Sequence, residues 1–279
     1  MRFLQLTSII GLLIQAQQTL SLTNPIRENP AEPDIFYDDG HYYMTYTSGD
    51  RIENTRASVI EDLRRGETKT IWTDSNEGRN DAMWAPEVHR VDGAWGGSIW
   101  SASRTGTVCP AIAKLDTKNW TVDQWHVISS PDQPWEKKMG GGKSGLGINE
   151  APFPLYHGDD IWITFSASHC KDPGYSLSLL KLNGGDPLQK TSWDKSGPIV
   201  SAAGGNYGVG HNAFFPLARR EASLDLFEKN LFHATKKSEG NCGPDRFAMI
   251  QQVIFDKDGN PSFDQPGALD AETAPPSGQ

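Results

Sequence analysis

Short apolar runs alternate with turn-forming residues along most of the chain. Runs rich in aromatic and β-branched side chains are separated by Gly, Asp, Asn and Pro, which is typical of strands joined by tight turns. The best helical segment, residues 57–66, would make fewer than three turns at about 3.6 residues per turn before it ends at Gly66. The hydrophobic pattern therefore predicts an all-β protein.

A loose hairpin pattern recurs along the sequence. Each copy has an apolar strand, an Asp-Gly type of turn and an aromatic strand, in YDDGHYYMTYTSG at 37–49, RVDGAWGGSIWSAS at 90–103, YHGDDIWITFSAS at 156–168 and a weaker FEKNLFHATKK at 227–237. Such turns between hydrophobic runs indicate hairpins. The copies lie roughly 50 to 70 residues apart, near the length of a propeller blade with its loops. We therefore predict a β-propeller; a β-sandwich ranks second, because its strands would be spaced more evenly.

The two ends of the chain differ from the rest. Residues 1–21 contain one Arg, then an apolar core, then small or polar residues, which predicts a secretory signal peptide. Cleavage after Ala16 or after Ser21 fits this pattern equally well. We therefore expect a secreted, extracellular protein with one propeller domain at 22–270 and a flexible tail at 271–279.

The charge balance narrows the classes of partner. The chain has 279 residues, of which 35 are acidic and 26 basic, giving a formal net charge of −9. No basic stripe stands out, so we expect no nucleic-acid or membrane partner. The nine Trp, seven Tyr and eleven Phe supply rings that fill sheet cores and that also stack on sugars.

Two segments with a glutamate share one layout. Glu150 in NEAPFPLYHGDD and Glu32 in AEPDIFYDDG each precede a Pro, an apolar run and an acidic turn. In a propeller the innermost strand of each blade begins at the central channel, so both carboxylates would converge on one cleft. Glycoside hydrolysis uses such a pair, about 6.5–9.5 Å apart in inverting enzymes, with one carboxyl as acid and the other activating water. The plainer interpretation is that both are solvated residues beside turns.

Eight segments carry a resemblance to a known family: NPIRENPAEPDIFYDDGHYYMTYT, TRASVIEDLRRGETKTIWT, WAPEVHRVDGAW, SSPDQPWEK, NEAPFPLYHG, YSLSLLKL, GNYGVGHNAFF and HATKKSEGNCGPDRFAMIQQV. They run in family order from residue 24 to about 265, and WAPEVH, NEAP and YGVGHN together make the match specific. The chain resembles glycoside hydrolase family 43, five-bladed propellers that cleave arabinofuranosyl and xylosyl linkages. Its likeness is strongest to the secreted, largely fungal arabinofuranosidase-type members.

The resemblance implies roles for five residues. Glu150 takes the general-acid position and Glu32 the general-base position. His211 matches a central-channel His that orders a water network or a structural calcium ion, and no cofactor is expected to be required. Trp84 would line the sugar subsite, and Arg246 matches a cleft Arg that orients hydroxyls or a carboxylate. Without the family, Trp84 and His211 would be read as core residues and Arg246 as a surface charge.

The base position departs from the family pattern, which has Asp-Pro where this chain has Glu32-Pro33. Glutamate is one methylene longer, so its carboxylate would reach about 1 Å too far, and such a misplacement can cost about a hundredfold in rate. Asp34 lies two residues on, on the same face of an extended segment. We therefore consider Asp34 as a substitute base.

About one blade of sequence is missing relative to the family. DGAW at 92–95 is followed directly by GGSIWSASRTGTVCPAIAKL, which resembles the end of the third blade's hairpin. Either the ring has four blades or the gene model has lost an exon. The missing stretch would hold the Asp that raises the pKa of the acid, and neither Asp92 nor Asp116 matches its motif. We therefore expect the pKa of Glu150 to lie in an ordinary acidic range.

Three cysteines lie outside the predicted signal peptide. Cys170 is the last residue of SASHC and Cys242 the last residue of SEGNC. These segments are expected on neighbouring blades, so we predict that the two cysteines form a disulfide. Cys109 lies near the apparent deletion and is left over.

The sequence therefore predicts a secreted, monomeric glycosidase that hydrolyses terminal α-L-arabinofuranosyl or β-D-xylosyl linkages of plant cell-wall polysaccharide or oligosaccharide with inversion, at an impaired rate. The competing prediction is a catalytically inactive relative that still binds sugar. A propeller used only as a protein-binding scaffold ranks third, because the sugar-site motifs persist.

Overall fold

The computed structural model describes residues 22–73, 84–91, 94–100, 108–116, 118–119, 121–140, 145, 147–216 and 229–273. These residues form antiparallel sheets with three short 3-10 helices, η1 (Ile60–Arg64), η2 (Pro134–Glu136) and η3 (Lys190–Ser192). The helix expected at 57–66 is therefore the single short turn η1. None of the helices in the described ranges is long and apolar enough to cross a membrane. The predicted signal peptide lies outside the described residues.

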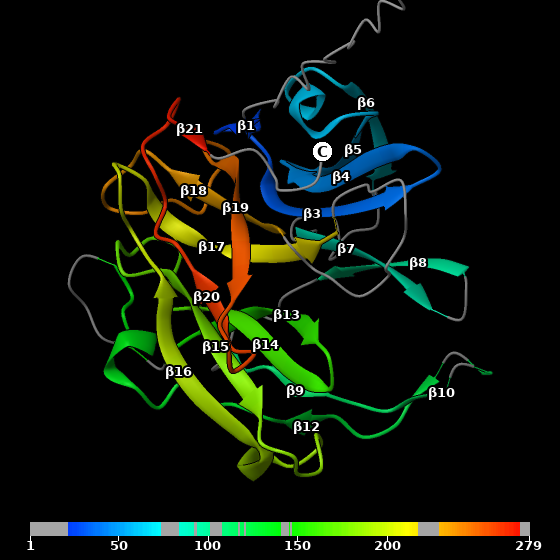
Figure 1. Ribbon diagram of the computed structural model, residues 1–279, viewed down its shortest axis with the longest axis vertical. Coiled ribbons are helices and arrows are strands. Elements are labelled where there is room, and N and C mark those ends of the chain that lie inside the picture. Colours follow the sequence, from blue (N-terminus) through cyan, green and yellow to red (C-terminus); the bar gives the residue numbers. More distant parts are fainter. Residues whose placement is uncertain are drawn as a thin grey trace, which may run out of the picture.

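Three sheets are built on meanders, in which consecutive strands pair, as in the blades of a propeller (Figure 1). The first contains β3 (Ala31–Asp38), β4 (His41–Ser48), β5 (Arg51–Ala57) and β6 (Glu67–Thr73). The second contains β13 (Asn149–His157), β14 (Asp160–Ala167), β15 (Ser176–Leu182) and β16 (Trp193–Val200). The third contains β17 (Tyr207–Phe215), β18 (Lys229–Thr235) and β19 (Phe247–Phe255), and its fourth strand is β2 (Arg27–Glu28).

The beginning of the described chain completes the third sheet. Strand β2 pairs with the start of β19, and the chain then runs into β3, so β2 fastens one blade to the next. The end of β19 pairs with β20 (Pro261–Phe263). Strand β1 (Leu22–Thr23) pairs with β21 (Glu272–Thr273). Residues 272–273, expected in a flexible tail, thus belong to the folded unit.

Three of the four predicted hairpins are present. Strands β3 and β4 are joined by Asp39 and Gly40, whose φ angles of 42° and 77° fit the tight turn that suits a twisted hairpin. Strands β13 and β14 form the second, and β7 (Trp84–Val91) with β8 (Ala94–Trp100) the third. The prediction for 227–237 is right only in its outgoing strand: Lys229–Thr235 form β18, which pairs with the preceding strand β17, but Lys229 already lies in the strand where a tight turn was expected.

The blade that lies between β6 and β13 in the chain differs from the other three in the described residues. It consists of the two strands β7 and β8, and the next strands form two small sheets. These pair β9 (Ala111–Ile112) with β12 (His126–Val127) and β10 (Leu115–Asp116) with β11 (Thr121–Val122). Strands β8 and β10 extend from one side of the body (Figure 1). Residues 101–107, close to the predicted deletion, lie outside the described ranges.

Within the described residues, the innermost strands are β3, β7, β13 and β17, which gather near the middle of the molecule (Figure 1). Strand β3 contacts β7 and β17, and β17 contacts β13. The circle is completed by the ring of His89 in β7, whose centroid lies 5.7 Å from that of Phe153 in β13. This arrangement confirms the all-β propeller, and its four inner strands agree with the reduced ring.

The core lies between these sheets. Its largest fully buried side chains include Trp162, Phe165, Phe214, Phe232 and Met44. Complete burial of a large apolar side chain contributes about 1.5–3 kcal/mol. The packing holds the innermost strands in place, and those strands carry the candidate site.

Candidate active site

Each innermost strand carries a β-bulge near its start. The ladder register breaks between Ala31 and Asp34, Trp84 and Glu87, Glu150 and Phe153, and Gly210 and Ala213. One non-glycine residue in each bulge has φ near +50°: Glu32 at 48°, Ala85 at 55°, Ala151 at 50° and His211 at 50°. Bulges re-aim side chains, and residues held in this costly backbone region cluster at functional sites.

The four bulges define equivalent positions. Glu32 and His211 are the residues with positive φ in their own bulges. Glu150 comes one residue before the positive-φ residue of its bulge, as Trp84 and Gly210 do in theirs. In a regular strand, side chains alternate between the two faces, and a β-branched residue would pack well at position 150. The bulge interrupts this alternation, so a glutamate can stand there. The sequence signal was the Pro that follows the residue with positive φ in the first three bulges.

The pKa of Glu150 is higher than that of an ordinary glutamate. By its surface exposure the residue is only half-buried, yet protein atoms surround its carboxyl closely. Burial raises the pKa of Glu150 to about 7, the charge of Glu32 adds to the rise, and Tyr175 and Arg246 oppose it. The Tyr175 hydroxyl donates a hydrogen bond of 2.8 Å to Oε1 of Glu150. The expectation of an ordinary acidic pKa is therefore wrong, because burial replaces the missing Asp as the main cause.

Glu32 is held in the ionised form. Its Oε1 lies 2.8 Å from a guanidinium nitrogen of Arg246, and the two side chains are 15% and 5% exposed. Burial alone would raise the pKa of Glu32, but Arg246, followed by His211 and Thr47, brings it below its ordinary value. Two carboxyls from different blades thus have pKa values shifted in opposite directions.

Tyr175 reaches Glu150 through a gap left by a glycine. A Cβ atom at Gly210 would lie 2.1 Å from Cε1 of Tyr175, so no larger residue fits at this position without movement. The Tyr175 ring stacks on His233 at 5.9 Å, and His233 stacks on His211 at 5.9 Å. Burial lowers the pKa of both histidines, and that of His233 falls well below its usual value. Both imidazoles are therefore neutral near pH 7.

His211 lies where the resemblance placed it, inside the candidate site. Its backbone N–H donates to Oγ of Ser166 at 2.7 Å, which fixes its bulge to β14. Ca²⁺ takes six to eight oxygen ligands, but the nearby Glu32 carboxylate is already paired with Arg246. A calcium ion beside His211 would thus depend largely on water for its ligands, and it stays a prediction.

Asp34, considered as a substitute base, links two innermost strands. It is buried, and its Oδ2 accepts a hydrogen bond of 2.7 Å from the backbone N–H of Val88. Burial raises the pKa of Asp34 to about 7, and the nearby charge of Glu87 also raises it. This carboxyl links β3 to β7, and its use as a substitute base stays a prediction.

Trp84 begins β7 and is 44% exposed, so it is not a core residue. The next backbone N–H, that of Ala85, donates to Oγ1 of Thr47 at 3.0 Å. Since Trp84 occupies the bulge position equivalent to Glu150, its exposed ring fits a stacking role beside the carboxyls. That role stays a prediction.

A buried charged cluster supports the start of β13. Glu136 accepts hydrogen bonds from Nδ2 of Asn149 at 2.8 Å and from Nζ of Lys195 at 2.9 Å. Glu136 is fully buried, and Asn149 directly precedes Glu150. The SSPDQPWEK segment contains Glu136, but no sequence pattern indicated a role for it, for Lys195 or for Tyr175.

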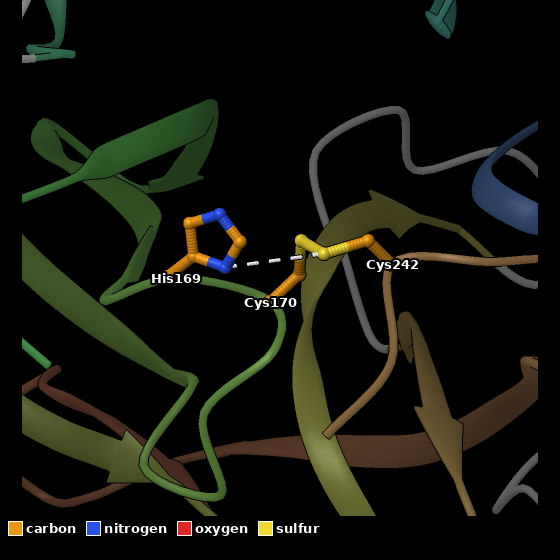
Figure 2. Close-up of side chains that lie close together, drawn as sticks. All are labelled: His169, Cys170 and Cys242. Atoms are coloured by element: carbon orange, nitrogen blue, oxygen red, sulfur yellow. Dashed lines mark hydrogen bonds between the residues drawn. A yellow bond between two sulfur atoms is a disulfide. The ribbon is translucent and has the colours of Figure 1, made fainter. Parts of the chain in front are cut away.

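The predicted disulfide is present. Cys170 and Cys242 are bonded, with Cα atoms 5.2 Å apart, and Cys109 is not in a disulfide. Figure 2 shows His169 beside this bridge, with its Nδ1 4.0 Å from Sγ of Cys242.

Comparisons with known proteins agree with this fold. The family model for glycosyl hydrolases family 43 matches residues 120–261. An extracellular exo-alpha-(1->5)-L-arabinofuranosidase of Streptomyces avermitilis is 27% identical over 91% of this chain and 65% of that protein. Alpha-L-arabinofuranosidase B of Pyricularia oryzae is 24% identical over 88% of this chain and 64% of that protein. The chain thus spans slightly less than two thirds of the length of these two relatives.

Solved structures share the fold. The alpha-L-arabinofuranosidase from Lactobacillus brevis superposes with a TM-score of 0.70 at 21% identity, covering 90% of this chain and 98% of that chain. A thermostable family-43 glycoside hydrolase gives 0.66 at 20% identity, covering 91% of this chain and 99% of that chain. The matched family model spans half of this sequence, and the chain belongs to glycosyl hydrolases family 43.

Proposed function

We propose that this protein is a secreted glycoside hydrolase that releases terminal α-L-arabinofuranosyl groups, or β-D-xylosyl groups, from plant cell-wall polysaccharide or oligosaccharide. The observation that carries the proposal is the pair Glu150 and Glu32, whose pKa values are shifted apart inside one site. Such divergence identifies the acid and the base of a reaction. Relatives named as arabinofuranosidases favour the arabinofuranosyl substrate, and the one named extracellular favours secretion.

The proposed reaction is a single displacement with inversion. Glu150, protonated near neutral pH, donates its proton to the glycosidic oxygen as the bond to the sugar breaks. Glu32 accepts a proton from the water that attacks the anomeric carbon from the opposite face. One water is consumed, and transfer of a proton through solvent from Glu32 to Glu150 restores the starting state. Arg246 keeps Glu32 ionised, and Tyr175 orients Glu150.

One observation favours the binding-only alternative. Glu32 replaces the shorter Asp of the family pattern, and its Oε1 is occupied by the nearly buried Arg246. A carboxylate held by a guanidinium is a weaker base. We therefore expect slow turnover, which Glu32→Asp alone does not fully restore, because the pair and its surroundings act as a unit.

The test measures turnover of aryl α-L-arabinofuranosides and aryl β-D-xylosides by the unmodified chain, by Glu32→Asp and by a chain with the missing blade restored. Glu150→Gln serves as the inactivated variant. Asp159→Asn is a matched control, because Asp159 is exposed at the other end of the same hairpin. Slow turnover that Glu150→Gln abolishes supports the proposal. Sugar binding by calorimetry, with equal background turnover in all variants, would favour the non-catalytic relative. Robust turnover by the unmodified chain would contradict the expected impairment.

A further inference from the structure

The Cys170–Cys242 disulfide joins two loops, and each loop carries the partner of one candidate catalytic carboxyl. Cys170 lies in the loop that follows β14 and leads to Tyr175, the hydrogen-bond donor to Glu150. Cys242 lies in the loop between β18 and β19 that leads to Arg246, the ion-pair partner of Glu32.

We propose that this disulfide is a positioning element for the reaction. It holds Tyr175 against Glu150 and Arg246 against Glu32 in one fixed arrangement. The inference rests on the proposed function for its kinetic consequences, but the positions of the two partner residues can be tested without turnover.

The first loop transmits the position of Cys170 to Tyr175 through short hydrogen bonds. The backbone N–H of Asp172 donates to the carbonyl of His169 at 2.9 Å, and that of Tyr175 donates to the carbonyl of Asp172 at 3.0 Å. The Asp172 carboxylate also accepts from the backbone of Gly174 at 2.8 Å and of Gly140 at 2.9 Å. Residues 169–175 therefore form a braced turn with little freedom between the bridge and the phenol.

The second loop is coupled even more directly. The guanidinium of Arg246 donates to the carbonyl of Cys242 at 3.2 Å and to the carbonyl of Gly243 at 3.0 Å. The bridged cysteine is thus itself a hydrogen-bond partner of Arg246. Because the same guanidinium pairs with Glu32, a displacement of Cys242 would move Arg246 relative to the carboxylate of the proposed base.

The two loops also touch beside the bridge. A Cβ at Gly240, where φ is +87°, would lie 2.7 Å from the carbonyl oxygen of Cys170 and 2.9 Å from the backbone nitrogen of Asp172. Only glycine allows this approach without movement. On the other side, Nδ1 of His169 accepts from the backbone of Lys171 at 3.0 Å. The two loops are therefore in close contact around the disulfide (Figure 2).

The residues around the disulfide were also considered as a metal site. His169, Cys170 and Cys242 place three ligand atoms within 4.8 Å of one another, a spacing that could hold a metal ion. In the structure the two sulfurs are bonded to each other, and a metal ligand must be a free thiolate. We therefore assign the cluster to the bridge.

The proposal predicts the direction of two pKa changes when the bridge is removed. If Arg246 moves away, Glu32 loses its main stabilising charge and its pKa rises. If Tyr175 moves away, Glu150 loses a donor to its carboxylate and its pKa rises too. Both limbs of the pH–rate profile should shift to higher pH, and kcat should fall by about ten- to hundredfold, as expected for displacements approaching 1 Å.

The experiment compares the unmodified chain with Cys170→Ala/Cys242→Ala, and Cys109→Ala serves as the matched control. The primary readout is the titration of the glutamate carboxyl carbons by NMR, which reports the pKa of Glu32 and Glu150 whether or not the protein is an enzyme. Kinetics on an aryl arabinofuranoside form the second readout. If the unmodified chain has no turnover, the proposed function fails, and the titration still tests the positioning role.

Raised pKa values for both carboxyls in the bridge variant, with the control unchanged, are the expected result. A merely structural bridge would lower the melting temperature and leave both pKa values in place, which would overturn the proposal. Gly240→Ala keeps both cysteines and disturbs the same contact, so it replaces the bridge variant if that protein does not fold. Unchanged carboxyl titrations in a folded Gly240→Ala protein would then overturn the proposal in the same way.

Discussion

Replacing Tyr175 by Phe should move the alkaline limb of the pH–rate profile to higher pH. The Tyr175 hydroxyl donates to Oε1 of Glu150 at 2.8 Å, and this hydrogen bond lowers the pKa of a carboxyl that burial has raised to about 7. Phe keeps the ring beside His233 and removes only the donor. The carboxylate is then less stabilised, so Glu150 keeps its proton to a higher pH.

The expected size follows from the chemistry of this contact. A hydrogen bond to a charged group is worth about 1.5–3 kcal/mol, and one to a neutral group about 1 kcal/mol. Only the difference between the two changes a pKa, and one pKa unit corresponds to about 1.36 kcal/mol. The alkaline limb should therefore rise by about one pH unit. Since Glu150 must be protonated to donate, activity above neutral pH should increase relative to the optimum.

The assay is kcat/KM between about pH 4 and 9 on an alkyl arabinofuranoside, whose poor leaving group needs the acid. Tyr156→Phe is a suitable control, because Tyr156 lies on the same strand as Glu150 but is 45% exposed. An alkaline limb that stays in place or moves down in Tyr175→Phe would show that Glu150 is not the group titrating there.

Three further changes test other contacts of the site. Glu150→Gln should reduce turnover of substrates with poor leaving groups by about 10²–10⁴-fold and of activated aryl substrates by less; equal losses would argue against Glu150 as the acid. Arg246→Ala leaves a nearly buried carboxylate without its ion pair, so urea denaturation at neutral pH should show a loss of about 3 kcal/mol, and an unchanged midpoint would contradict the pairing. Gly210→Ala puts a Cβ 2.1 Å from Cε1 of Tyr175, so it should lower the melting temperature and raise the alkaline limb, whereas Gly267→Ala, with open space at its Cβ, should do neither.

The sequence by itself determined the hairpins, the disulfide and the positions of the candidate acid and base. The hairpins are local properties: a turn such as Asp39-Gly40 fixes the pairing of its own two strands. The disulfide joins residues 72 positions apart, and its prediction depended on the expected order of the blades. The copy at 227–237 was predicted less well, because β17 and β18 are joined by a long connection and not by a tight turn.

Only the tertiary structure decided how the site is charged. The sequence placed Glu150 near a missing Asp and implied an ordinary pKa, but the folded ring buries its carboxyl and raises the pKa to about 7. Tyr175 and Arg246 reach the carboxyls from loops that are distant in the chain, and Asp34 is used to link two blades. A pKa depends on desolvation and on charges brought together by ring closure. These quantities belong to the assembled sheets, and no local pattern of residues encodes them.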